Sequence, residues 1–255
     1  MLKISKYIIY DILRSKVLIA YTLFLLVISF ALFYLENDSA KSLVSLLSVV
    51  LIIVPLISVV FATTYFYNAY EFIELLVAQP LSRNSILLGE FIGVSVSMVA
   101  AFALGVGLPV LIYVPEATGF VLVLAGVSVT LCFVSIAFFS SVAMRDKAKG
   151  IGMSLMLWFY FAVIYDAIVL GILFSFSDYP LDKAVIALAS LNPIDMARIM
   201  VLMKLDISAL MGFTGAVYKQ FFGSNFGLFY TMGIMMVWIT VPLVLAVRIF
   251  KTKNL

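Results

Sequence analysis

Two short stretches of this sequence carry the side chains that could bind a partner or form ion pairs. The first, YEFIELLVAQPLSRNSILLGEF at residues 70–91, sets two carboxylates, a proline and an arginine between two strongly apolar segments. The second, ALASLNPIDMARIM at 187–200, places Asp195 and Arg198 three residues apart, a spacing at which they can pair on a helix. Charged residues make up only 11% of the chain, so these stretches are the candidate functional sites.

The sequence lacks the residues of the common catalytic sites. It has no histidine, which excludes an H-E-x-x-H zinc site, a Ser-His nucleophile pair and an imidazole proton relay. It has no G-x-x-x-x-G-K-[ST] loop that could hold nucleotide phosphates. Cys132 is the single cysteine, so no disulfide within the chain is expected. We therefore expect a protein that is not an enzyme.

The elements that must position these side chains follow from the composition. Hydrophobic residues make up 65% of the 255 positions, more apolar surface than one soluble core could bury, which indicates an integral membrane protein. A helix needs about 20 apolar residues to cross a bilayer. Six stretches qualify and predict an all-α protein with one transmembrane domain over 1–255; they lie at about 17–35, 44–66, 85–113, 119–144, 150–174 and 226–247.

The basic residues predict the orientation of these spans. Six crossings put both termini on one side, and Lys and Arg are retained on the cytoplasmic side of a membrane. Of the 16 basic residues, five fall on the side opposite the termini: Lys41, Lys183, Arg198, Lys204 and Lys219. We therefore expect cytoplasmic termini. The net charge of +3 forms no dense basic cluster, so nucleic acid is not an expected partner.

Residues 1–16, MLKISKYIIYDILRSK, predict an amphipathic helix. Lys3, Lys6, Tyr10 and Arg14 recur at three to four residues, and apolar side chains make up much of the rest. This pattern is typical of a helix that lies in the inner membrane interface. A simple basic flank before the first span is the alternative. Because the first apolar run has full membrane length, we do not expect a removable signal peptide.

Residues 67–84 are expected to form a cytoplasmic elbow. Glu71 and Glu74 belong to a predicted short helix that stops near residue 79, because Pro80 disfavours a helical residue before it and has no N–H to donate. The helix, stop and following helix would present a compact charged knob to the cytosol. An ordinary inner loop is the alternative.

The start of the third span carries three further expectations. Ser82 or Asn84 can cap it by accepting hydrogen bonds from its free backbone amides. Glu90 follows closely and is expected to face water at the inner surface. Gly89 and Gly93 form a G-x-x-x-G pattern that permits close helix packing, either within one subunit or between two copies.

Asp166 is the one clear ionisable candidate inside a span. Its position in the fifth span places it in the outer half of the membrane. It is either a gate or substrate contact, as in an ion-coupled secondary carrier, or a carboxylate paired at the outer interface. A structural membrane scaffold is a further alternative for the whole protein.

The elbow resembles the corresponding stretch of type-2 ATP-binding-cassette permeases. In that family the sequence reads roughly E-LL-x-x-P-[LV]-SR followed by ILLGK-x-x-G, and Glu90 stands where lysine is common. The resemblance implies a six-span permease in a prokaryotic inner membrane that works as a homodimer. It also implies that the elbow is a coupling helix docking on a separate ATPase subunit, which binds ATP and Mg²⁺, while this chain binds no cofactor. The matching positions are Glu71, Glu74, Pro80, Ser82, Arg83, Gly89 and Gly93.

The second stretch resembles the LNP-x-D-x-x-R segment in permeases of NosDFY-type transporters, which support nitrous oxide reductase maturation. The matching residues are Leu191, Asn192, Pro193, Asp195 and Arg198. Asn192 before Pro193 indicates a turn, and Asp195 is favoured at the start of the following helix. The resemblance implies a NosF-like ATPase, a periplasmic NosD-like partner facing the extracytoplasmic segment 175–225, and a role in copper processing. A mere helix start in an outer loop is the alternative.

Methionines follow on the same predicted helix. Met196, Met200 and Met203 recur at four and three residues, and Met211 lies further on. Thioethers suit Cu(I), but a methionine stripe at this spacing is more typical of an adaptable packing surface. We therefore assign no metal site and expect Met196, Met200 and Met203 to face lipid or a partner.

Overall fold

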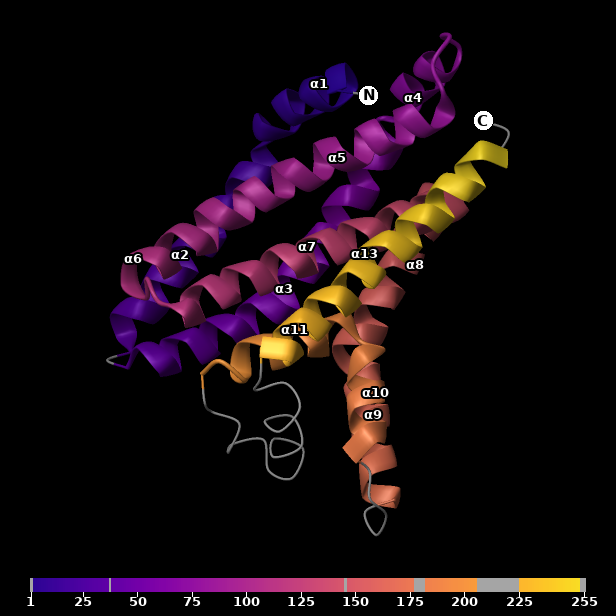
Figure 1. Cartoon of the computed structure of the whole chain (residues 1–255). Coiled ribbons are helices and arrows are strands. Elements are labelled where there is room, and N and C mark those ends of the chain that lie inside the picture. The colour runs from indigo at the N-terminus through magenta and orange to yellow at the C-terminus, as the bar shows by residue number, and fades with distance from the viewer. Residues whose placement is uncertain (1, 37, 145, 177–181, 206–224, 253–255) are drawn as a thin grey trace.

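The structure is a computed structural model that describes residues 2–36, 38–144, 146–176, 182–205 and 225–252. In this part of the chain every regular element is a helix (Figure 1). The first half contains α1 (Leu2–Leu13), α2 (Lys16–Leu35), α3 (Ser39–Asn68), α4 (Tyr70–Val77), α5 (Arg83–Phe102), the π-helix η1 (Ala103–Gly107) and α6 (Leu108–Tyr113). The second half contains α7 (Ala117–Ala143), α8 (Lys147–Phe159), the π-helix η2 (Tyr160–Ile164), α9 (Tyr165–Ser175), α10 (Asp182–Ser190), α11 (Pro193–Leu202) and α13 (Asn225–Thr252).

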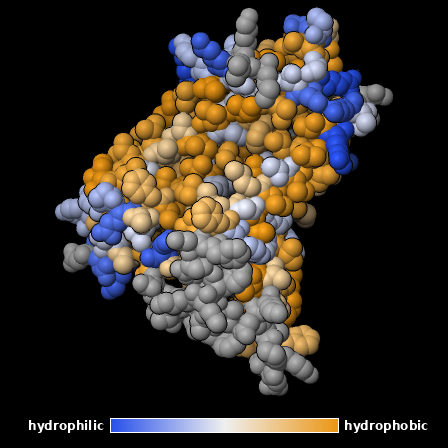
Figure 2. Space-filling view, in the orientation of Figure 1, coloured by the Kyte–Doolittle hydropathy of each residue, from blue (hydrophilic) through white to orange (hydrophobic). Residues whose placement is uncertain are grey.

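Six helical segments are long and apolar enough to cross a membrane, as predicted. They are α2, α3, α5–α6 with η1, α7, α8–α9 with η2, and α13. Both termini lie at one end of the bundle together with α4, and we call this the terminal end (Figure 1). Figure 2 shows a broad hydrophobic band between hydrophilic ends, the surface expected of a protein surrounded by lipid.

Helix α7 forms the centre of the bundle. It packs against α3, α5, α8, α11 and α13. Its side chains are apolar almost all round, which is typical of a fully enclosed helix. In the most apolar part of each span, 67% of the residues are buried in α7 but only 11% in α8–α9. The fifth span therefore lies at the edge of the bundle and diverges from it in Figure 1.

Polar side chains fix where the helices begin. Each accepts a hydrogen bond from a backbone N–H in the first turn, which the helix itself leaves without a partner. Ser82 caps α5 in this way, so of the two predicted candidates the serine is the cap. The other such caps are Ser15, Asp38, Asp146 and Asn192.

Two spans contain a π-helical turn. In the third span, η1 ends at Gly107, two positions before Pro109, which has no backbone N–H to donate to the preceding turn. In the fifth span, η2 separates α8 from α9. Pro55 and Pro242 instead lie inside α3 and α13, which continue through them as helices. Such π-helical turns are frequent at functional sites.

Helices α10 and α11 meet at a bend of 114°. The sequence predicted this segment outside the membrane, but the pair is apolar enough to enter it, and α11 packs against α3, α7 and α13. Because the two termini share one end of the bundle, the pair does not make a further crossing (Figure 1). We call this bent pair the re-entrant hairpin; its helix α11 packs at the end of the bundle opposite the termini.

Candidate functional site

The predicted elbow helix is α4, and its two faces differ sharply. Ile73 and Leu76 are buried against the adjoining helices. Glu71, Glu74 and Leu75 lie on the exposed face, and the Leu75 side chain is 67% exposed. The helix is therefore held by an apolar face while it presents two carboxylates and a leucine outward. This arrangement is suited to docking against another protein.

The elbow consists of a short helix, a turn and the start of the next helix, as the sequence predicted. Helix α4 ends at Val77, an exposed turn follows through Pro80, and α5 begins at Arg83. The Arg83 guanidinium donates hydrogen bonds to the carbonyl oxygens of Phe250 and Lys251, at 3.5 and 3.2 Å. A cation at this position stabilises the carboxyl end of α13 through the helix dipole. Arg83 thus anchors the elbow within the protein.

Further hydrogen bonds at the terminal end connect α3, which precedes the elbow, to the α7–α8 connection. The Tyr67 hydroxyl, near the end of α3, donates to the carbonyl oxygens of Ser141 and Met144 at 3.2 and 3.4 Å. The Lys147 ammonium donates to Asn68 Oδ1 at 2.8 Å. These bonds join α3, the helix that leads into α4, to the α7–α8 connection.

Glu90 does not face water, contrary to the prediction. Its side chain is fully buried, and neither carboxylate oxygen has a hydrogen-bond partner among the described residues. The reason is the position of α1, which packs along α5. A Cβ on Gly93 would lie 2.5 Å from Ile8 Cγ2, so the second glycine of the G-x-x-x-G pattern serves packing of α1 within one subunit. This packing covers the acid that the sequence placed at the surface.

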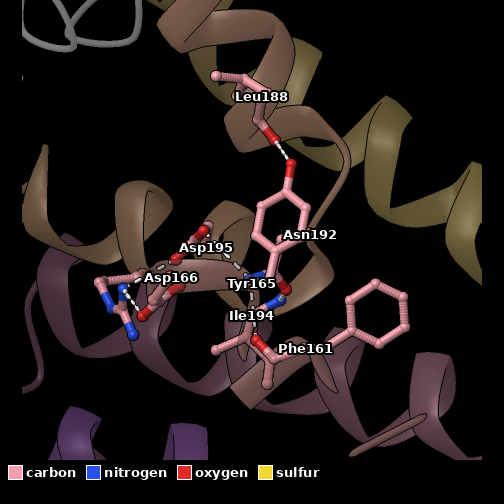
Figure 3. A network of polar contacts seen from close by, with 8 residues as sticks. Phe161, Tyr165, Asp166, Leu188, Asn192, Ile194 and Asp195 are labelled. Carbon is pink, nitrogen blue, oxygen red and sulfur yellow. Dashed lines mark hydrogen bonds and ion pairs between the residues drawn. The ribbon is translucent and has the colours of Figure 1, made fainter. Parts of the chain in front are cut away.

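A second polar site lies at the bend of the re-entrant hairpin (Figure 3). We call its five residues the bend cluster: Tyr165, Asp166, Asn192, Asp195 and Arg198. Asn192 Oδ1 accepts from the Ile194 N–H at 3.0 Å and so caps α11. Its Nδ2 donates to the Phe161 carbonyl oxygen in η2 at 3.0 Å and to Asp195 Oδ2 at 3.1 Å. One buried amide therefore joins the hairpin to the π-helical turn of the fifth span.

Arg198 joins the same elements by charge. Its Nη1 lies 2.8 Å from Asp195 Oδ1, which confirms the predicted pairing, and 3.1 Å from Asp166 Oδ2. Asp166 is thus a partnered carboxylate, as one of the two interpretations of the sequence expected. The Asp195 side chain is 14% exposed and that of Arg198 is 34% exposed. Desolvation at Asp195 strengthens its attraction to the guanidinium, and these bonds hold α11 against the fifth span.

Aromatic side chains hold the turn of the hairpin from two sides. The Tyr165 hydroxyl donates to the Leu188 carbonyl oxygen at 2.6 Å. From α13, Trp238 Nε1 donates to the Ser190 carbonyl oxygen at 3.1 Å, and Tyr230 Oη lies 2.9 Å from Ser190 Oγ. The sequence did not reveal these roles, because the acceptors are mostly backbone carbonyls that any residue supplies. The tyrosine beside Asp166 was the one available signal.

The methionine stripe faces inward. Met196 is fully buried and Met200 is 3% exposed, so the expectation that they face lipid or a partner is wrong. The cause is the placement of α11 against α3, α7 and α13, which turns this face of the helix into core. Met203 is half-buried, and Met211 lies outside the described residues. Met196 and Met200 therefore pack within the chain itself.

The two sites are joined through the protein. Thr63 of α3 and Ser154 of α8 share a buried hydrogen bond of 2.9 Å. Further along, Trp158 Nε1 donates to the Ile52 carbonyl oxygen at 3.3 Å. Helix α8 then continues into η2, whose Phe161 carbonyl accepts from Asn192. A continuous set of bonded helices therefore runs from the elbow to the bend cluster.

Comparison with known proteins identifies the family of this chain. Residues 2–255 match the family model described as ABC-2 family transporter protein. The chain belongs to the ABC-2 family. It is 28% identical over 223 residues to the "Probable ABC transporter permease protein NosY" of Pseudomonas aeruginosa, covering 79% of this chain and 81% of that one. It is 24% identical over 266 residues to the protein of the same name in Stutzerimonas stutzeri, covering 95% of each.

As an ABC-2 permease, the chain is a non-catalytic subunit of a transporter, and such permeases pair with an ATPase subunit. Family membership therefore argues against the two alternatives, an ion-coupled secondary carrier and a structural membrane scaffold. Asp166, the residue on which a carrier mechanism depended, is engaged with Arg198. Among the described residues no group of three or more His, Cys, Asp or Glu side chains could hold a metal ion.

Proposed function

We propose that this permease is the membrane subunit of a NosDFY-type transporter, in which a NosF-like ATPase drives motion of a NosD-like partner. Two relatives named as NosY permeases and the LNP-x-D-x-x-R segment at 191–198 support the assignment to a NosDFY-type transporter. The activity would then be mechanical and contribute to copper processing during nitrous oxide reductase maturation. The protein would work as a homodimer of single permease domains.

In this proposal α4 is the coupling helix. Glu71 and Glu74 make ionic contacts with the ATPase. The exposed Leu75 enters an apolar pocket of the ATPase that lies between these two contacts. Pro80 and Ser82 set the turn and the start of α5, and Arg83 fixes the base of the elbow on α13. The terminal end would be cytoplasmic, which the excess of basic residues there favours, and the membrane would be the inner membrane of a prokaryote.

The observation that carries the proposal is the bonded connection between elbow and bend cluster. Closure of two ATPase subunits would move α4, and α3 would transmit the motion to α8 through the Thr63–Ser154 bond. The fifth span would then act on the hairpin through Asn192. At that end Asp195, Arg198 and Pro193 support the surface on which the partner rests, and Asp166 holds Arg198 in place through their ion pair.

The test is recruitment of the ATPase. A doubly substituted permease, Glu71→Lys with Glu74→Lys, is co-expressed with an affinity-tagged NosF-type ATPase subunit, and both are purified from membranes. Reversal of charge on the exposed face should lower copurification at least tenfold, which is ~1.4 kcal/mol of association energy. Undiminished copurification would refute the docking role.

The matched control is Glu116→Lys, which reverses an exposed charge near the start of α7, at the other end of the bundle. It should copurify like the unsubstituted protein. Arg83 is tested separately by Arg83→Gln, because its bonds to α13 give it an internal role as well.

A further inference from the structure

A groove of about 850 Å³ lies between the N-terminal helix and α3. At the terminal end its walls carry polar side chains from α1, from the connection that follows it and from the end of α3, including Asp11, Arg14 and Asn68. Deeper in the bundle its wall on α3 is apolar and includes Leu56 and Val60. Asn68 and Leu56 are separated by 12 positions, so the groove extends about 18 Å along the helix axis. Its polar end thus lies at the terminal end of α3, and its apolar end lies along the membrane-spanning part of that helix.

The polar end presents one acid and one base that do not neutralise each other. Asp11 and Arg14 both line the groove, yet no ion pair joins them in the described part of the chain. The Tyr65 hydroxyl donates to Asp11 Oδ2 at 3.4 Å, and the other carboxylate oxygen retains its acceptor capacity. The Arg14 guanidinium lies 3.9 Å from the centre of the Tyr10 ring and bonds the Tyr10 hydroxyl. Arginine has five N–H donors, so this contact orients it while other donors are available.

We propose that the groove binds a zwitterionic phospholipid with a primary ammonium group, such as phosphatidylethanolamine, from the leaflet at the terminal end. Arg14 binds the phosphate and Asp11 binds the ammonium. One acyl chain lies along the apolar wall of α3. This site is independent of the function proposed above.

The charge pattern selects this lipid class over its common alternatives. A phosphatidylglycerol headgroup has no cation for Asp11 and places an anion beside the carboxylate. A phosphatidylcholine headgroup has a cation, but its quaternary ammonium has no N–H to donate to the carboxylate. Basic pockets between membrane helices at the cytoplasmic side are known to bind lipid headgroups, and the added acid here makes the pocket selective for a zwitterion. The charged hydrogen bond to Asp11 supplies the discrimination.

Native mass spectrometry of the delipidated full-length permease tests the proposal. Phosphatidylethanolamine, phosphatidylcholine and phosphatidylglycerol with identical acyl chains are added in turn, and the retained lipid is measured. We expect about threefold greater retention of phosphatidylethanolamine, the ratio that one exposed ion pair provides. Equal retention of the three lipids would overturn the proposal.

Variants then assign the selectivity to residues. Asp11→Asn keeps an oxygen that can accept from Tyr65 but loses the charge, so it should abolish the preference, and Asp11→Glu should retain it. Arg14→Gln should lower retention of all three lipids. Glu116→Gln, an exposed acid at the opposite end, should change nothing. Persistence of the preference in Asp11→Asn would contradict the assignment, whether or not Arg14→Gln folds.

A second copy of the chain is the competing occupant. In a Cys132→Ser background, Val60→Cys places a thiol on the exposed part of the groove wall. If lipid fills the groove, oxidation in native membranes should leave this variant monomeric by denaturing electrophoresis. A quantitative disulfide-linked dimer would show that another subunit occupies the groove and would overturn the proposal.

Discussion

The bend cluster depends on the donor group of Asn192, and Asn192→Ala measures that dependence. The substitution removes the cap of α11, which is worth about 1 kcal/mol. It also leaves the Phe161 carbonyl without the Asn192 amide, at a cost of roughly 1–3 kcal/mol in a buried setting. The sum, about 2–4 kcal/mol, corresponds to a Tm lower by roughly 5–15 °C for a chain of this size.

Asn192→Asp separates the two contributions. Aspartate is as good a cap as asparagine, so it preserves the bond to the Ile194 N–H. It lacks the amide donor for Phe161 and adds a carboxylate beside Asp195. We therefore expect Asn192→Asp to be at least as destabilising as Asn192→Ala. If Asn192 served only as a helix cap, Asn192→Asp would leave the stability unchanged.

Thermal unfolding in detergent gives the Tm, and amide hydrogen exchange over 184–202 locates the change. Leu191→Ala is the matched control, because this neighbouring side chain is 58% exposed and should shift Tm by less than about 2 °C. If Asn192→Asp unfolds at the same temperature as the unsubstituted protein, the bond to η2 carries no energy and the reasoning fails.

Three further predictions follow from single contacts. Arg198→Met should destabilise the protein by about 1–3 kcal/mol, because it leaves the largely buried Asp195 beside Asp166 without its cation. The further change Asp166→Asn should restore part of the Tm, and an additive double variant would contradict this coupling. Glu90→Met should raise Tm by replacing an unpartnered buried carboxyl with an apolar side chain, and a lower Tm would show that the acid has a partner. In an Ile12→Cys variant, Gly93→Leu should displace α1 and make the new thiol reactive to maleimide, because a side chain at Gly93 would overlap Ile8. Gly152→Leu, where a side chain would meet open space, should leave this thiol protected.

Much of the candidate site is local and was therefore predictable. Helix α4, its end shortly before Pro80 and the cap at Ser82 depend on neighbours within a few positions. The Asp195–Arg198 pair depends on helical spacing alone. The expectations that failed concern which face of a helix is covered. Glu90 was placed in water because no local pattern reveals that α1 folds over it.

The sequence by itself determined the class of the protein and its spans, because the length and apolarity of a membrane helix are properties of one continuous segment. It also identified the elbow and the residues of the hairpin. Only the tertiary structure decided that α11 enters the end of the bundle, that Met196 and Met200 belong to the core, and that Asn192 reaches Phe161. These facts depend on which helices pack together, and the partner atom at the decisive contact is a backbone carbonyl, which every residue carries and no sequence pattern singles out.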